Sequence, residues 1–322
     1  MDHSQSGAHL ESRDAEWESR VERAAHADVR ELLRSVRRRR RERWLVGSVG
    51  LVAVALVLVL LFRIGLFDGA AADGAQAPGP EPTEPAALVL DLSRPFAKTP
   101  AADWSDGAAG IVLPPAQRVG EFSAERVAAA LRDVRDVLVA SRLDPRLVVD
   151  HDPGAFLAAL APDARRQLEP LFGSGHEAEA QSLVSMVAAG TRLLPVEPKV
   201  NGRMTVRAGG EGELVVHTNY VFVYAFHTDR PEKIVDPMDI LVVVRAEVDY
   251  ILRVGDRWAR GSQGWWYDKT AGYAYSIACD AYRKGFLAPA FTDPTHTEAH
   301  GRDRGVYFDP TGPLPPTSGC AS

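Results

Sequence analysis

The chain has 322 residues and a net charge of −6 at pH 7, and residues 1–43 carry 11 Arg against 9 acidic residues, so that residues 63–322 carry a net charge of −8. Because phosphate binding requires a basic surface, this acidic part of the chain argues against a nucleic-acid partner. It is long enough for one substantial domain or two small ones.

Residues 1–43 are expected to form a cytoplasmic, arginine-rich helical segment. Between Glu11 and Arg43 the chain contains neither Pro nor Gly, and apolar residues recur every three or four positions from Trp17 to Val36. This spacing predicts a helix with a thin apolar stripe. The stripe suits a solvated helix that continues into the next segment, or one that binds a partner helix or lies on a membrane surface.

The segment that follows is predicted to be a transmembrane helix over residues 44–66. Trp44–Phe62 contains 19 residues without a charge, enough for a helix to cross most of a bilayer core of about 30 Å. Arg37–Arg43 precedes it, whereas acidic residues follow Arg63. Since Arg and Lys stay on the cytoplasmic side, the N-terminus is expected inside the cell and the C-terminal part outside.

Two other interpretations of this apolar segment remain. A cleaved signal peptide would use Ala70–Ala72 or Ala75–Ala77 as its cleavage site, but its apolar region is normally only about 7–15 residues long. A buried soluble helix would need a protein core on all its faces. Next, residues 67–87 are rich in Pro, Ala and Gly and are expected to be a linker.

Residues 88–322 are predicted to form an extracytoplasmic α+β domain with an extended N-terminal arm. A short strand is possible at Leu88–Leu92. Ser123 is a suitable N-cap for a helix that ends near Asp144, with Val127, Leu131, Val134 and Leu138 on its core face. Further helices are expected after Asp152, from Ala161 to Leu171, and from Glu177 to about Ala188.

After Pro198 the hydrophobic period changes to two. Glu213–His227 and Asp239–Arg253 have apolar residues at alternate positions, which predicts long antiparallel strands with one buried face. The loop length between them predicts a register in which Phe222 lies opposite Val244. The remaining expected elements are a strand at Met204–Arg207, a turn at Gly209–Gly212, a two-residue hairpin at Gly255–Asp256 leading into Trp258–Tyr267, and a last element at Tyr273–Ala281.

The order of these elements, helices first and then long strands, indicates helices packed on one face of an antiparallel sheet. This order, ending on the sequence GWWYDK at Gly264–Lys269, resembles the NTF2-like cone fold over residues 123–282, a fold that also occurs behind single membrane spans in Mce-associated envelope proteins. The arm at Thr99–Pro114 resembles uncharacterised membrane-anchored proteins of high-GC bacteria. Neither resemblance implies a catalytic residue. The tail after Ala281 is expected to be irregular.

Two cysteines, Cys279 and Cys320, both lie in the part expected outside the cell. An even number of cysteines in an oxidising compartment predicts a disulfide, and two free thiols are the alternative.

The predicted register also brings polar residues together on the face opposite the core. His217 is expected to lie opposite Asp249, as a directly opposed or diagonal pair, and Asn219 opposite Glu247. These four residues, together with Trp266 as an outward aromatic residue, are the five candidate binding residues. No GxSxG nucleophile motif accompanies His217 and Asp249. His296 and His300 are four residues apart, as in a zinc protease motif, but Glu298 does not directly follow His296, so neither a metal nor a cofactor is expected.

The sequence therefore predicts a single-pass, membrane-anchored envelope protein whose outer domain is a non-enzymatic module. Its partner is expected to be an envelope protein or a cell-wall or lipid component. The alternative is a small-molecule-binding or enzymatic pocket inside an NTF2-like cone.

Overall fold

A computed structural model describes residues 91–293 and 304–314 together with Cys320. The predicted cytoplasmic segment at 1–43, the predicted span at 44–66 and the linker at 67–87 lie outside the described residues. Among the helices that are described, none is both long and apolar enough to cross a membrane. Of the possible strand at Leu88–Leu92, the two described residues are not in a strand.

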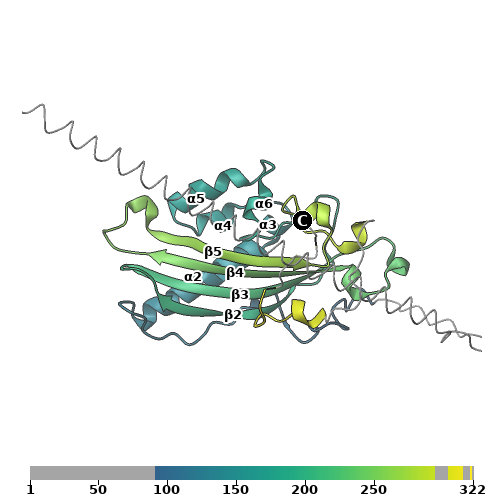
Figure 1. Cartoon of the computed structure of the whole chain (residues 1–322), viewed down its shortest axis with the longest axis horizontal. Helices are drawn as coiled ribbons and strands as arrows, with labels where there is room; N and C mark the ends of the chain where they lie inside the picture. Colours follow the sequence, from purple (N-terminus) through teal and green to yellow (C-terminus); the bar gives the residue numbers. More distant parts are fainter. Residues whose placement is uncertain (1–90, 294–303, 315–319, 321–322) are drawn as a thin grey trace, which may run out of the picture. The chain divides into compact units, whose positions relative to one another are not determined.

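The described part of the chain is an α+β fold built on a five-stranded antiparallel sheet, as the alternating pattern predicted. The strands follow one another in sequence order across the sheet, and Figure 1 shows β2 to β5 side by side. The strands are β1 Ser105–Asp106, β2 Lys199–Ala208, β3 Glu213–Ala225, β4 Leu241–Arg253 and β5 Gly264–Tyr275.

The longest described helix, α2 (Ala124–Arg142), crosses one face of this sheet (Figure 1). Ser123 is its N-cap, as predicted, and the Ser123 hydroxyl accepts a hydrogen bond from the Arg126 amide at 3.3 Å. Its buried stripe contains the four predicted core residues and continues to the last turn, where Arg142 is also buried. The helix therefore places a charged residue on its core-facing side.

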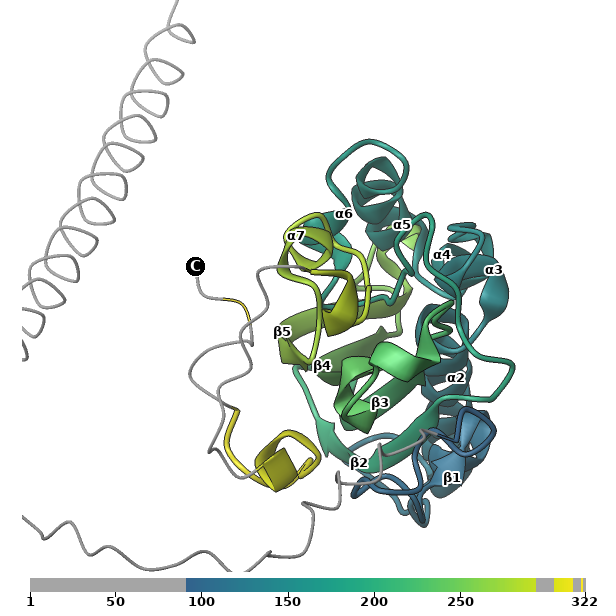
Figure 2. The same ribbon diagram turned by 90° about the vertical axis from the view of Figure 1, so that its right-hand side faces the viewer.

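The described residues also contain five shorter α-helices. Figure 2 shows α3 to α6 grouped beside and above the sheet, with α7 near the end of β5. The predicted helix from Glu177 to Ala188 is wrong in length, because it ends at Ala180 and the following residues turn so that their carbonyl groups face Arg142. The helices are α3 Pro145–Val148, α4 Gly154–Ala158, α5 Pro162–Leu168, α6 Glu177–Ala180 and α7 Cys279–Tyr282.

The register of β3 and β4 is the predicted one. Phe222 lies opposite Val244, and the pairing continues without a shift over the full length of both strands. It is fixed because the side chains of each strand alternate between two faces, and slipping by one residue would move the apolar set out of the core.

The turn before β3 and the loop after β4 differ in how well the sequence predicted them. The turn at Gly209–Gly212 joins β2 to β3, as expected; Gly212 has φ +73°, a conformation that favours glycine. The two-residue hairpin at Gly255–Asp256 is wrong, because residues 254–263 form a longer loop containing the 3₁₀ turn Arg260–Ser262. Tyr273, predicted in a separate last element, belongs to β5.

Each face of the sheet has its own hydrophobic core. We call the face that carries α2 the inner face and the other the outer face. The inner core includes the fully buried side chains of Tyr220, Phe222, Tyr224 and Tyr250, packed with the helices. The outer core covers only the half of the sheet near the end of β3, where arm and tail residues such as Phe96, Tyr307 and Phe308 pack on Val221 and Val223.

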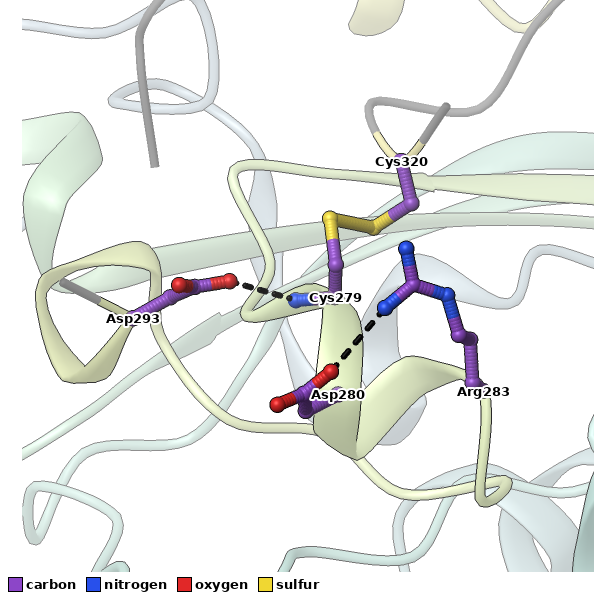
Figure 3. The surroundings of a disulfide bond; sticks show 5 residues. All are labelled: Cys279, Asp280, Arg283, Asp293 and Cys320. Carbon is purple, nitrogen blue, oxygen red and sulfur yellow. Dashed lines mark hydrogen bonds and ion pairs between the residues drawn. A yellow bond between two sulfur atoms is a disulfide. The ribbon is translucent and has the colours of Figure 1, made fainter. Parts of the chain in front are cut away.

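The predicted disulfide between Cys279 and Cys320 is present, with a Cα–Cα distance of 5.3 Å. Cys279 begins α7, where its amide donates to the Asp293 carboxylate at 3.2 Å (Figure 3). The bond connects the C-terminal tail to the end of β5.

Candidate functional site

The outer face of the sheet has a polar half, whose buried members Asn219 and Arg245 donate hydrogen bonds to the tail. It lies toward the start of β3 and the end of β4, and its side chains come from three strands. On β2, Thr205 and Arg207 are exposed. The residues that we call the polar half are Arg203, Thr205 and Arg207 of β2, His217 and Asn219 of β3, and Arg245, Glu247 and Asp249 of β4.

Asp249 is the centre of this group. Its side chain is only 7% exposed, yet it contacts two basic groups. The Arg207 guanidinium donates to Oδ2 at 2.8 Å, and Nδ1 of His217, directly across the strand pair, lies 2.8 Å from Oδ1. A buried carboxylate paired on both oxygens holds its two neighbours in fixed positions.

His217 lies between two carboxylates. Its second ring nitrogen, Nε2, lies 3.5 Å from Oε1 of Glu247, and the two side chains are 32% and 29% exposed. Activation of a nucleophile would need a hydroxyl or thiol on that nitrogen. Thr205 lies opposite His217 on β2, but the ring nitrogen faces Glu247, so the arrangement suits recognition better than catalysis.

Arg245 and Asn219 are buried members of this group and are hydrogen-bonded to each other. Arg245 is 4% exposed, and its Nε donates to Oδ1 of Asn219 at 3.1 Å. It also lies 3.7 Å from Glu247 and donates to the carbonyl groups of Asp309 and Gly312 in the tail. Asn219, a predicted binding residue, is therefore buried and connects the sheet to the tail.

Trp266 faces outward, as expected of at least one of the three adjacent aromatic residues. It lies near the 254–263 loop, and it contacts Ser262 and Arg253, which are outside the polar half. The Arg253 guanidinium lies over the Trp266 ring and over that of Trp258, at 4.5 and 4.4 Å from the ring centroids. Arg253 also pairs with Glu213 at 3.1 Å. Because Arg253 occupies one face of the ring, Trp266 stabilises this end of the hairpin.

Arg142 is a feature of the inner face that the sequence analysis missed. Its side chain is 1% exposed and donates to the carbonyl groups of Gln181, Ser182 and Val184 and to the Ser185 hydroxyl. Burial lowers the pKa of this guanidinium, with smaller opposing effects from nearby tyrosines. A signal existed, because Arg142 follows Leu138 by four residues and so continues the apolar stripe.

Within the ranges that the structure describes, no group of three or more His, Cys, Asp or Glu is arranged to hold a metal. His296 and His300 lie outside those ranges. No protein-family model, no curated protein and no solved structure matches the chain.

Proposed function

We propose that the chain is a single-pass membrane-anchored envelope protein whose described domain is an extracytoplasmic, non-enzymatic binding module. The apolar segment at 44–66 would be the anchor, and Arg37–Arg43 would keep the N-terminus in the cytoplasm. The Cys279–Cys320 disulfide supports an external location, because such bonds persist in oxidising compartments.

The observation that carries the binding role is the polar half of the outer face. His217 and Glu247 are each about one-third exposed, while the two residues that position them, Asp249 and Arg245, are buried. The accessible groups are therefore held in place before a partner arrives, which lowers the entropy cost of binding. Arg and Trp side chains near the same surface are typical of protein interfaces, so we propose an envelope protein as the partner.

We also propose that the domain is an NTF2-like cone, in which α2 and the short helices close one side of the antiparallel sheet. The small-molecule alternative would need space inside this cone. Phe222, Tyr224 and Tyr250 are fully buried in the inner core, which favours the interaction role. A cavity at the end of α2 favours a small ligand at a different place.

The proposal is tested by site-specific photo-crosslinking of the full-length protein in its native membrane. A benzoylphenylalanine placed at Thr205, exposed within the polar half, is expected to form an adduct with a single envelope protein. The matched control is the same residue at Val112, which is 69% exposed on the arm. Adducts that do not differ between the two positions, or none from Thr205, would contradict a binding role for this face.

A further inference from the structure

We infer that the cavity beside Arg142, at the β5 edge of the sheet, is a binding site for a small organic molecule with a single carboxylate. This inference does not rest on the role proposed for the polar half, with which the cavity shares Arg245.

Arg142 carries a buried positive charge that has no partner of opposite sign among the described residues. An arginine keeps its proton in proteins, and Arg142 is 1% exposed. Its hydrogen-bond partners are three carbonyl groups and one hydroxyl, all of them neutral. Among the ion pairs of the described residues, none involves Arg142. A buried charge normally has a partner of opposite sign, because removing it from water costs free energy.

Arg142 also has a hydrogen-bond donor without an acceptor among the described residues. The Nε atom of Arg142 is buried and has no hydrogen-bond partner among the described residues. Buried N–H groups are almost always paired, and Nη2 beside it makes one hydrogen bond with its two N–H groups, so this edge of the guanidinium points to a missing acceptor. A carboxylate is the acceptor that best matches the planar guanidinium, because its two oxygens can accept two N–H groups side by side.

A cavity beside Arg142 provides space for a ligand. A cavity of about 290 Å³ is lined by Arg142 together with Gln181, Ser182 and Val184, the residues whose carbonyl groups bind the guanidinium. Arg142 and the turn that encloses its guanidinium therefore form part of the wall of this cavity. Its volume is at the lower end of ligand pockets, which span about 300–1,000 Å³, so it suits a small molecule.

The lining of the cavity selects the body of the ligand. The cavity is also lined by Val244 and Ala274 from the strands and by Leu287 and Tyr282 from the α7 region. These groups favour an apolar body over a fully hydrated ion such as phosphate. Arg245 also lines the cavity, but Glu247 lies 3.7 Å from its guanidinium, so of the two arginines only Arg142 lacks a partner of opposite sign. The site therefore suits a monocarboxylate with a compact hydrocarbon part.

The test uses benzoate and its neutral isostere benzamide, measured by isothermal titration calorimetry on the full-length protein. Benzoate is expected to bind saturably, and benzamide about tenfold more weakly or worse, because the amide lacks the charge. Arg142→Met keeps the apolar stem and removes the charge, and it is expected to lose the preference for benzoate. Inorganic phosphate is expected not to compete.

A second variant keeps the test independent of Arg142 folding effects. Thr270 is exposed at the β5 side of the cavity; Thr270→Phe is expected to block entry and weaken benzoate binding, whereas Thr270→Ser is expected to bind as the wild type does. Equal affinity for benzoate and benzamide, no benzoate binding to the wild type, or unchanged binding in Thr270→Phe would overturn the inference. None of these results bears on crosslinking from Thr205.

Discussion

His217 and Asp249 lie directly opposite each other on β3 and β4, and the distance between Nδ1 and Oδ1 is 2.8 Å. The same carboxylate binds Arg207 through its other oxygen. One buried acidic residue thus connects three strands, because Arg207 comes from β2. This arrangement makes Asp249 the residue on which the geometry of the polar half depends.

Replacing Asp249 by Asn should therefore weaken the fold. The variant keeps the shape of the side chain but loses its charge, and we expect a destabilisation of about 1–2 kcal/mol. The lower part of that range reflects the 54% exposure of Arg207, which reduces the contribution of its ion pair. Urea denaturation measures the change, and Asp268→Asn at an exposed position of β5 is the control. Equal stability of the two variants would contradict the central role of Asp249.

Two neighbouring tyrosines of β3 should respond in opposite ways to loss of their hydroxyls. The hydroxyl of Tyr224 donates to the Arg142 carbonyl at 2.8 Å and contacts the Ser185 hydroxyl at 3.0 Å. Tyr224→Phe is expected to cost about 1–2 kcal/mol of unfolding free energy. The hydroxyl of Tyr220 is equally buried but has no partner among the described residues, so Tyr220→Phe should be neutral or stabilising.

Denaturant unfolding of both variants, with the wild type alongside, checks this pair. A larger loss in Tyr220→Phe than in Tyr224→Phe would mean that the hydrogen bonds of Tyr224 do not stabilise the inner core.

The sequence predicted the sheet better than it predicted the loops around it. Strict alternation of apolar residues fixes both strand and face, so the pairing of His217 with Asp249 could be predicted. The Gly255–Asp256 pair led to a wrong loop prediction. The stacking of Trp258 and Trp266 on Arg253 depends on contacts between residues outside that pair. A short-range turn signal does not include such contacts.

The interior site was missed for a related reason. An arginine in the last turn of a helix normally lies in solvent, where it interacts favourably with the helix dipole. Only the turn at Ser182–Ser185, which brings carbonyl groups to Arg142, makes burial of this side chain acceptable. The same turn ends the helix that was expected to reach Ala188, so the two errors have one cause.

Stability should fall steeply at alkaline pH. Burial raises the pKa of Tyr220, Tyr224, Tyr250 and Tyr273 to about 12, from 10.0. Their contribution is therefore complete below pH 10, where both states are protonated. It is lost as the pH rises from 10 to 12, because the unfolded chain releases these protons first. We expect tyrosinate absorbance to rise together with loss of circular dichroism; titration near pH 10 in a folded domain would contradict this.

Removing the disulfide should destabilise the C-terminal tail most. Cys279 and Cys320 are 41 residues apart in sequence, and by the chain-entropy model a bond closing such a loop contributes about 4 kcal/mol. The double variant with both cysteines changed to Ser should melt earlier and should expose Tyr307 to hydrogen exchange of its amide. In the wild type, neither cysteine should react with a thiol reagent in denaturant without reductant; labelling of both would exclude the bond.

The most direct test of the account is the side of the membrane on which the described domain lies. A protease added to intact cells stripped of their wall should digest a C-terminal tag and the domain beyond residue 87, and it should leave an N-terminal tag protected. This result is expected if Arg37–Arg43 holds the preceding segment in the cytoplasm, as proposed. A protected C-terminal tag, with the N-terminal tag digested, would contradict an extracytoplasmic binding module.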